Sequence, residues 1–310
     1  MYLNRTAHVA LCKVYVRDKT VRKGAFMKKL RRAVFAGSWY PASAAECERE
    51  IKAFLESDQT GTVPDRKFVG GIVPHAGWFF SGSIACNVIR LLAEKEQPDV
   101  IVIFGMHLHP GSPRFIMTEG GYETPFGELG IESTLANALT EKFSFQIETA
   151  DRFTQDNTIE LQLPFIKYFF KDARIVPVGV PPNGSSSEIG KAVADISERL
   201  GLKVKVIGST DLTHYGPNYG FTPKGSGSAA ADWVRNENDR RIIEAMAAME
   251  PETVIREALT NRSACCAGAA AAAIAASISM GAERAEIVKY ASSYDKHPGD
   301  SFVGYAGIVF

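Results

Sequence analysis

The sequence has no long hydrophobic run and no excess of either charge. No apolar stretch in its 310 residues reaches the roughly 20 residues that a helix needs to cross a bilayer. Basic and acidic residues number 35 each, so the formal net charge is zero. Because such a chain has no global field to attract nucleic acid or an anionic membrane, we expect neither as a partner. A small molecule or a peptide is the expected ligand.

Cysteine is also scarce, which excludes a disulfide-rich secreted scaffold. The five cysteines form no CxxC pair and follow no short regular spacing. A reducing cytoplasm fits this usage best. The cysteines are Cys12, Cys47, Cys86, Cys265 and Cys266.

Residues 1–26 differ from the rest of the chain. They are basic and lack both the uninterrupted apolar segment and the small-residue cleavage site of a signal peptide. Because Met27 is followed by two lysines, we expect the natural start there and a mis-assigned extension or disordered tail before it. A short added strand is the alternative. Residues 27–310 are expected to form a single α/β domain.

Apolar strands alternate with amphipathic helices along this domain, which predicts a three-layer sandwich around a mostly parallel sheet. Two adjacent final strands, 286–292 and 302–310, would add an antiparallel edge. Residues 122–127 are predicted to be a turn-rich loop, and the glycine-rich segment 219–228 a mobile connection or lid. The other strands are predicted to end at Val73, Gly105, Thr118, Val180 and Thr210.

Several helix starts carry recognisable signals. Ser43 with Glu46, and Ser185 with Glu188, have the spacing of a capping box. Further helices are predicted over 83–94, 133–142, 158–170, 229–249 and 251–259, and in the alanine-rich segment that begins at residue 267.

Polar side chains follow three of the predicted strands where each one ends. His75 follows the first, His107 and His109 the second, and Asp211 and His214 the third. Because the carboxyl ends of parallel strands share one edge of a sheet, these groups are expected to converge although they are distant in sequence. A single histidine there would be better explained by hydrogen bonding within its turn, and only the other residues favour a site.

Cys265 and Cys266 lie at the predicted start of the alanine-rich helix, where backbone N–H groups favour a thiolate. Two imidazoles and a thiolate suit zinc, copper or iron, with a position left for water, substrate or dioxygen. Asp211 and His214 could be ligands, orienting partners or an acid/base pair, and the spacing does not choose among these.

Segments distributed along the chain carry a family resemblance. From Leu30 to Phe310 the chain resembles the Memo family, and the order of the shared segments makes the match strong. These segments are AVFAGSWYPAS (33–43), PHAGWFFSG (74–82), ETPFGE (123–128), IELQLPF (159–165), STDLTHYGP (209–217), the Cys265 region and VGYAGIVF (303–310).

The resemblance implies a fold like that of class III extradiol dioxygenases, which are non-haem iron enzymes. Matched motif by motif, it implies that His75, His107 and Cys265 hold a metal, with Asp211 and His214 nearby in catalytic roles. Iron or copper is the implied cofactor, with zinc possible. Animal members act in motility signalling, and prokaryotic members are linked with radical SAM proteins, which makes such a protein a possible partner.

This chain departs from the family pattern at three places. The GMHLHPG turn offers both His107 and His109 at a shifted spacing. Asn157 stands where many members carry histidine. Cys266 stands where glycine usually follows the cysteine, so it could compete with Cys265 or form a redox pair with it.

Three hypotheses follow. The first is a metal-binding protein with redox or oxygenase-type chemistry, in which Asp211 and His214 manage protons. The second is a non-catalytic module that binds a peptide or small aromatic ligand in the same pocket, supported by Trp39, Tyr40, Trp78 and Phe79. The third makes Cys265 a covalent nucleophile activated by a histidine. His8 and His297 are placed outside the site.

Overall fold

The computed structural model describes residues 29–57 and 63–310. The expectation for residues 1–26 therefore lies outside the described residues. Within the described part of the chain, no helix is both long and apolar enough to span a bilayer.

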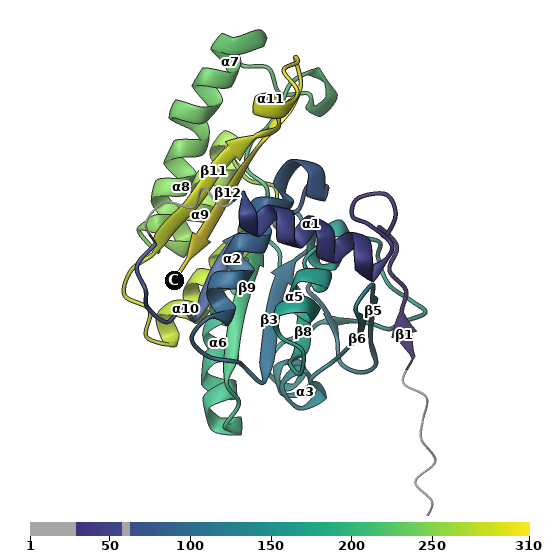
Figure 1. Cartoon of the computed structure of the whole chain (residues 1–310). Helices are drawn as coiled ribbons and strands as arrows, with labels where there is room; N and C mark the ends of the chain where they lie inside the picture. Colours follow the sequence, from purple (N-terminus) through teal and green to yellow (C-terminus); the bar gives the residue numbers. More distant parts are fainter. Residues whose placement is uncertain (1–28, 58–62) are drawn as a thin grey trace, which may run out of the picture.

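A nine-stranded sheet forms the centre of the fold (Figure 1). Four neighbouring strands run parallel in the order β2 (Gly70–Val73), β9 (Val204–Ser209), β3 (Val100–Gly105) and β8 (Arg174–Gly179). They are buried nearly throughout, as expected for parallel strands that are covered on both faces. Their carboxyl ends therefore share one edge, as predicted.

Antiparallel strands extend the sheet on both sides. Beyond β8 lie β4 (Phe115–Met117) and then β7 (Gln146–Glu148). Beyond β2 lies β12 (Phe302–Val309), which pairs with β11 (Glu286–Ser292) and with the short β10 (His214–Tyr215). The two final strands thus form the predicted antiparallel edge.

Helices cover the two faces of the sheet, as Figure 1 shows. A Cβ added at Gly71 would meet Val88 of α2, whereas one added at Gly70 would meet Ser277 of α10. Because successive residues of a strand point to opposite faces of the sheet, α2 and α10 lie on opposite faces. The α2 face carries α1 (Ala44–Glu56), α2 (Ser83–Ala93) and α5 (Leu163–Phe169). The α10 face carries α3 (Ser133–Lys142), α6 (Ser185–Leu200), α9 (Pro251–Asn261) and α10 (Ala267–Ser279).

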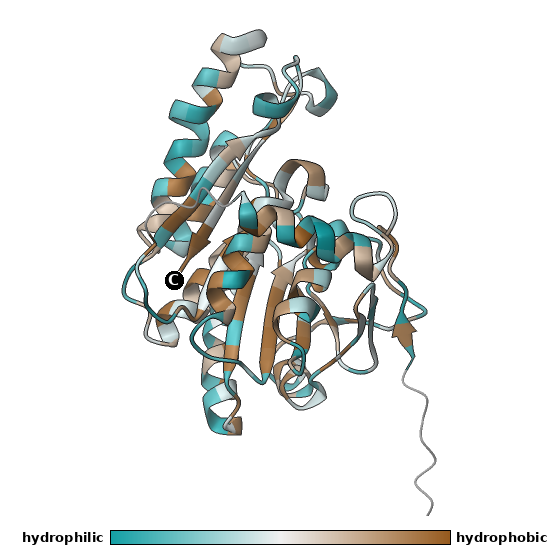
Figure 2. Cartoon of the chain, in the orientation of Figure 1, coloured by the Kyte–Doolittle hydropathy of each residue, from teal (hydrophilic) through white to brown (hydrophobic). Residues whose placement is uncertain are grey.

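The alanine-rich α10 is the most deeply buried helix on its face. Eleven of its residues are buried, from Ala267 to Ser277. A Cβ added at Gly190 of α6 would lie 2.2 Å from the carbonyl oxygen of Ala272, and one at Gly208 of β9 would lie 2.7 Å from that of Ala269. Small side chains therefore let α10 pack directly against both the sheet and α6. The hydropathy colouring agrees, with brown strands inside and teal on the outer helix faces (Figure 2).

Four local predictions were wrong. The segment 122–127 belongs to a hairpin of β5 (Gly121–Thr124) and β6 (Gly127–Gly130), which pairs with β1 (Leu30–Arg31). The helix predicted over 158–170 is split into α4 (Asn157–Glu160) and α5, because Pro164 at the start of α5 lacks the N–H that a continuous helix needs.

The two other errors concern the start of α6 and the helical segment 227–247. Gly184 is the N-cap of α6, and the hydroxyl of Ser185 donates to Asn183 Oδ1 instead of capping the helix. The helix predicted over 229–249 consists of α7 (Gly227–Trp233), a π-helical turn over 234–238 and α8 (Asp239–Ala247). The cap predicted at Ser43 is present, since its Oγ accepts from the N–H of Glu46.

Candidate metal centre

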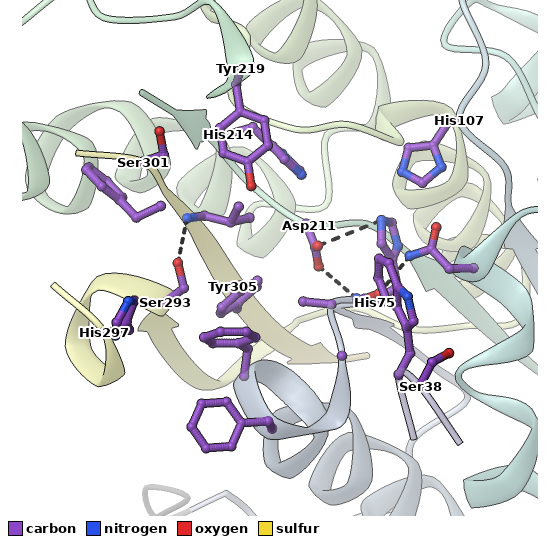
Figure 3. Close-up of a pocket in the computed structure, with 18 residues that line it drawn as sticks. Ser38, His75, His107, Asp211, His214, Tyr219, Ser293, His297, Ser301 and Tyr305 are labelled. Atoms are coloured by element: carbon purple, nitrogen blue, oxygen red, sulfur yellow. Dashed lines mark hydrogen bonds and ion pairs between the residues drawn. The ribbon is translucent and has the colours of Figure 1, made fainter. Parts of the chain in front are cut away.

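The three predicted strand ends bring their polar residues to one place. His75 lies two residues beyond β2, Asp211 two beyond β9 and His107 two beyond β3, and these strands are neighbours in the sheet. Figure 3 shows the three side chains on one side of a shared pocket. The convergence predicted from the sequence is therefore present in the fold.

Two cysteines complete a cluster of four potential metal donors. Sγ of Cys265 lies 3.2 Å from Nε2 of His75, and the rings of His75 and His107 have centroids 5.0 Å apart. With Cys266, each residue offers one donor atom, and these atoms all lie within 4.8 Å of one another. His75 and Cys266 are buried, whereas the His107 side chain is 44% exposed. Nitrogen and sulfur donors thus lie close together beside the pocket, which the two histidines line.

His75 is oriented by a serine in β9. Ser209 Oγ lies 3.0 Å from Nδ1 of His75 and donates its hydrogen to the carbonyl oxygen of Thr158, 2.7 Å away. Since the hydroxyl has only one hydrogen, it must accept at the imidazole, so Nδ1 carries a proton there. The other ring nitrogen, Nε2, is left to face Cys265 and can bind a metal.

His107 is oriented in the same way by a carboxylate. Asp156 Oδ2 accepts both the backbone N–H of His107, at 3.1 Å, and its Nδ1–H, at 3.0 Å. The preceding residue, Met106, has a positive φ of 73° and donates its N–H to Thr158 Oγ1 at 2.8 Å. This uncommon backbone conformation turns the chain sharply after β3 and directs His107 towards the cluster.

Asp211 accepts hydrogen bonds from the backbone N–H groups of two cluster residues, His75 and Cys265. Its Oδ1 accepts the N–H of His75 at 2.7 Å, and its carbonyl oxygen accepts the N–H of Cys265 at 3.2 Å. Its Oδ2 lies 3.9 Å from Nε2 of His75. The Asp211 carboxylate therefore lies next to the metal donors, close enough to affect the protonation of His75.

The charges of these groups depend on one another. Burial disfavours ionisation of Cys265, but hydrogen bonding from Cys266 and the two imidazoles hold the pKa of this thiol well below its usual value. Desolvation lowers the pKa of His107, yet Asp156 and Cys265 outweigh it and raise that pKa to about 10. Desolvation is likewise outweighed at His75, whose pKa is raised by Asp211 and Cys265. These interactions therefore favour the thiolate form of Cys265 and the protonated form of the two imidazoles.

The cluster opens into a pocket of about 520 Å³. Asn157 lines it and donates from Nδ2 to the carbonyl oxygen of His75, at 2.9 Å. His214 also lines it, with Nδ1 donating to the carbonyl oxygen of Leu212 at 3.1 Å and its ring edge-to-face with Tyr219. Aromatic side chains form much of the remaining wall: Trp39, Phe79, Phe80, Phe302 and Tyr305.

The structure resolves several questions that the sequence left open. His107 belongs to the cluster, whereas His109 is exposed and lies outside it. His297, which we placed outside the site, lines the far side of the same pocket (Figure 3). Of the four aromatic residues expected near the pocket, Trp39 and Phe79 line it, but Tyr40 and Trp78 are buried in the core.

Sequence reasoning missed Asp156 and Ser209, the residues that orient the two histidines. Asp156 precedes Thr158 and caps α4 by accepting its backbone N–H, so an Asx-type cap signal was present in the sequence. Nothing in that signal connects it to His107. Ser209 begins the STDLTH segment, but only the neighbouring strand shows that its hydroxyl meets His75.

The donor set fits a transition metal. Imidazole nitrogen and thiolate sulfur suit zinc, copper and iron, and both histidines use Nδ1 for a protein partner, leaving Nε2 for the metal side. The low pKa of Cys265 supplies the thiolate that a metal ligand must be.

Comparison with known proteins places the chain in a family. The family described as Memo-like protein matches residues 31–309. A MEMO1 family protein of Pyrococcus furiosus is 35% identical over 292 residues, covering 90% of this chain and 98% of the relative. A MEMO1 family protein of Methanopyrus kandleri is 34% identical over 293 residues, with the same coverage.

Among solved structures, an uncharacterised protein of Escherichia coli K12 is similar at a TM-score of 0.44 and 10% sequence identity, covering 79% of this chain and 100% of that one. The sequence matches, which extend over nearly all of the domain, decide the assignment: this chain belongs to the Memo family.

Proposed function

We propose that the protein binds a transition-metal ion through Nε2 of His75, Nε2 of His107 and Sγ of Cys265, and uses it on a small ligand in the adjoining pocket. The observation that carries this proposal is the convergence of these donors beside the pocket, which both histidines line, with Nδ1 of both imidazoles already engaged. Iron or copper is the proposed ion, with zinc as a further candidate. Iron or copper would supply redox or oxygenase-type chemistry.

Asp211 and His214 are proposed to handle protons for that chemistry. Burial raises the pKa of the Asp211 carboxyl, although His75 opposes the shift, so this group can hold a proton beside the cluster. In His214, Nδ1 is engaged by the carbonyl oxygen of Leu212, which leaves Nε2 to exchange a proton with a pocket ligand. Both residues line the pocket, so a bound ligand can reach them.

The shape of the pocket indicates the class of ligand. Its volume of about 520 Å³ suits a small organic molecule. Trp39 is 41% exposed and Phe79 is 67% exposed, so parts of two aromatic rings are accessible to a ligand at its wall. Since aromatic faces stack favourably on planar ligands, a small aromatic compound is the proposed ligand class.

Metal content tests the proposal. The full chain, purified without chelator or affinity tag, is expected to contain close to one metal ion, and His75→Ala to lose most of it. His109→Ala is the matched control, because it removes an exposed histidine outside the cluster. Equal metal content in all three proteins would contradict the proposal. The absence of metal from all three, even after anaerobic reconstitution, would contradict it as well.

A second candidate is a non-catalytic module that binds a peptide or a small aromatic ligand in the same pocket. The exposed rings of Trp39 and Phe79 favour it, since aromatic rings left in water at a pocket often contact a ligand. Ligand binding that is equally tight in the metal-free protein and in His75→Ala would support this candidate over the first.

A further inference from the structure

The cluster contains one more donor than the three-residue site proposed above. Cys266 offers Sγ within 4.8 Å of the donor atoms of His75, His107 and Cys265. Its side chain is only 2% exposed and lines neither the main pocket nor the smaller pocket of about 320 Å³ that Cys265 borders. Its sulfur therefore meets the other three donors from the interior of the protein.

The backbone holds the two sulfur atoms together. The N–H of Cys265 donates to the carbonyl oxygen of Asp211 at 3.2 Å, and the N–H of Cys266 donates to Thr210 Oγ1 at 3.1 Å. Both acceptors belong to the segment that directly follows β9. Cys266 is also the N-cap of α10, so the packed helix fixes its position from the other side.

The donor atoms lie within roughly 1–1.5 Å of the separations that a tetrahedral site requires. Zinc lies about 2.3 Å from sulfur and about 2.0–2.1 Å from histidine nitrogen, so tetrahedral donors lie roughly 3.3–3.8 Å apart. The four donors here are separated by at most 4.8 Å. A contraction of about 1 Å, which rotation of the cysteine side chains can provide, would bring all four onto one ion.

We infer that Cys266 is a fourth metal ligand, so that this chain holds its ion with two histidines and two cysteines. The inference rests on the metal site of the proposed function and adds a ligand to it. Two thiolates favour an ion that accepts tetrahedral sulfur ligation, Zn²⁺ or Cu⁺, over Fe²⁺. A pocket ligand must then add as a fifth donor or displace a thiolate.

Cobalt substitution counts the thiolates. Metal-free full-length protein is titrated with Co²⁺, whose near-ultraviolet absorption scales with the number of bound thiolates. We expect one Co²⁺ per chain, absorption that falls by about half in Cys266→Ser and in Cys265→Ser, and no such absorption in the double variant. Cys86→Ser, in α2 and outside the cluster, is the control and should match the parent.

Because a variant at a buried cysteine could fail to fold, a second measurement uses the unaltered protein. X-ray absorption of the zinc-loaded parent protein should show two sulfur and two nitrogen neighbours. One sulfur neighbour, with Cys266→Ser absorbing as strongly as the parent in the cobalt titration, would overturn this inference and leave the three-ligand site intact. Failure of the parent and His75→Ala alike to bind Co²⁺ or Zn²⁺ would overturn both proposals.

Discussion

Asp156 accepts two hydrogen bonds from His107 through a single carboxylate oxygen, Oδ2, one from the backbone N–H and one from Nδ1. This oxygen sets both the path of the turn and the rotation of the ring. Burial alone would raise the pKa of the Asp156 carboxyl, but the hydrogen bonds from His107 and Thr158 outweigh it and lower that pKa strongly. Asp156 is therefore the principal orienting partner of the more exposed histidine in the cluster.

Replacing this carboxylate should weaken metal binding without removing a ligand. In Asp156→Asn the amide can still accept at the cap of α4, but the charged acceptor at His107 is lost. Loss of such an orienting partner typically costs roughly 10- to 100-fold in metal affinity. Competition titration against a chromophoric chelator measures it. The control, Asp172→Asn, alters an exposed carboxylate and should bind as the parent does; equal affinity in Asp156→Asn would refute the assigned role.

A buried aspartate outside the donor set should impose a pH dependence on stability. Asp239 is fully buried, accepts from the N–H of Thr213 at 3.0 Å and from the hydroxyl of Tyr290 at 2.9 Å, and burial raises its pKa to about 7 against these hydrogen bonds. In the unfolded chain the carboxyl has a pKa near 3.8. Between these values the folded state binds more protons, so its stability falls as pH rises through the window.

Asp239→Asn removes this titration while keeping a similar shape. The free energy of unfolding of the variant, relative to the parent, should rise by up to about 1 kcal/mol per pH unit between pH 4 and 7 and level off above that range. Urea denaturation of both proteins at several pH values measures the difference. A difference that stays constant with pH would show that Asp239 ionises normally in the folded state.

The contact between α6 and α10 predicts a strong steric effect at a single glycine. A methyl group at Gly190 would lie 2.2 Å from a backbone carbonyl oxygen of α10, which cannot move aside as a flexible side chain could. Gly190→Ala should therefore destabilise the protein by about 1–3 kcal/mol, outweighing the helix-propensity gain of about 1 kcal/mol. Gly184→Ala is the matched control.

Gly184 has helical dihedral angles and nothing within 4 Å of an added Cβ, so the same substitution there should be neutral or slightly stabilising. Chemical denaturation of both variants makes the comparison. If Gly190→Ala and Gly184→Ala had equal free energies of unfolding, α6 and α10 could move apart to make room for the methyl group without a loss of stability.

The exposed ring of Phe79 should matter for ligand binding and hardly at all for folding. Because it is 67% exposed, Phe79→Ala should change the free energy of unfolding by less than about 0.5 kcal/mol. The same change should weaken binding of a small aromatic ligand several-fold, as measured by calorimetry. Leu200→Ala, which also removes an exposed apolar side chain but lies away from the pocket, should leave binding unchanged. Unaltered binding in Phe79→Ala would exclude stacking on this ring.

The parts of the site that depend on strand order could be predicted from the sequence. Apolar runs before His75, His107 and Asp211 identified parallel strands, and the ends of parallel strands meet at one edge. The family resemblance singled out Cys265, whose sulfur does lie beside His75. The roles of these residues, and of His214, remain predictions.

What the sequence could not supply were contacts made by side chains between segments. Asp156 reads as a helix cap, and its second role depends on where the turn after β3 lies. The choice between His107 and His109 likewise depends on the positive φ of Met106, which no local pattern demands. The hairpin of β5 and β6 was missed because its glycines and proline resemble those of an open loop.

The burial of α10 has a consequence for the metal selectivity of the proposed site. The helix contacts the sheet and α6 mainly through small side chains, and its backbone lies close to Gly190 and Gly208, so it has little space in which to shift. The cysteines immediately before it are therefore presented on a nearly rigid support. Ions whose preferred coordination differs from this arrangement cannot be accommodated by moving the support, and they should bind with only part of their intrinsic affinity. Discrimination between metals would then be encoded as much in the alanines of the core as in the ligands themselves.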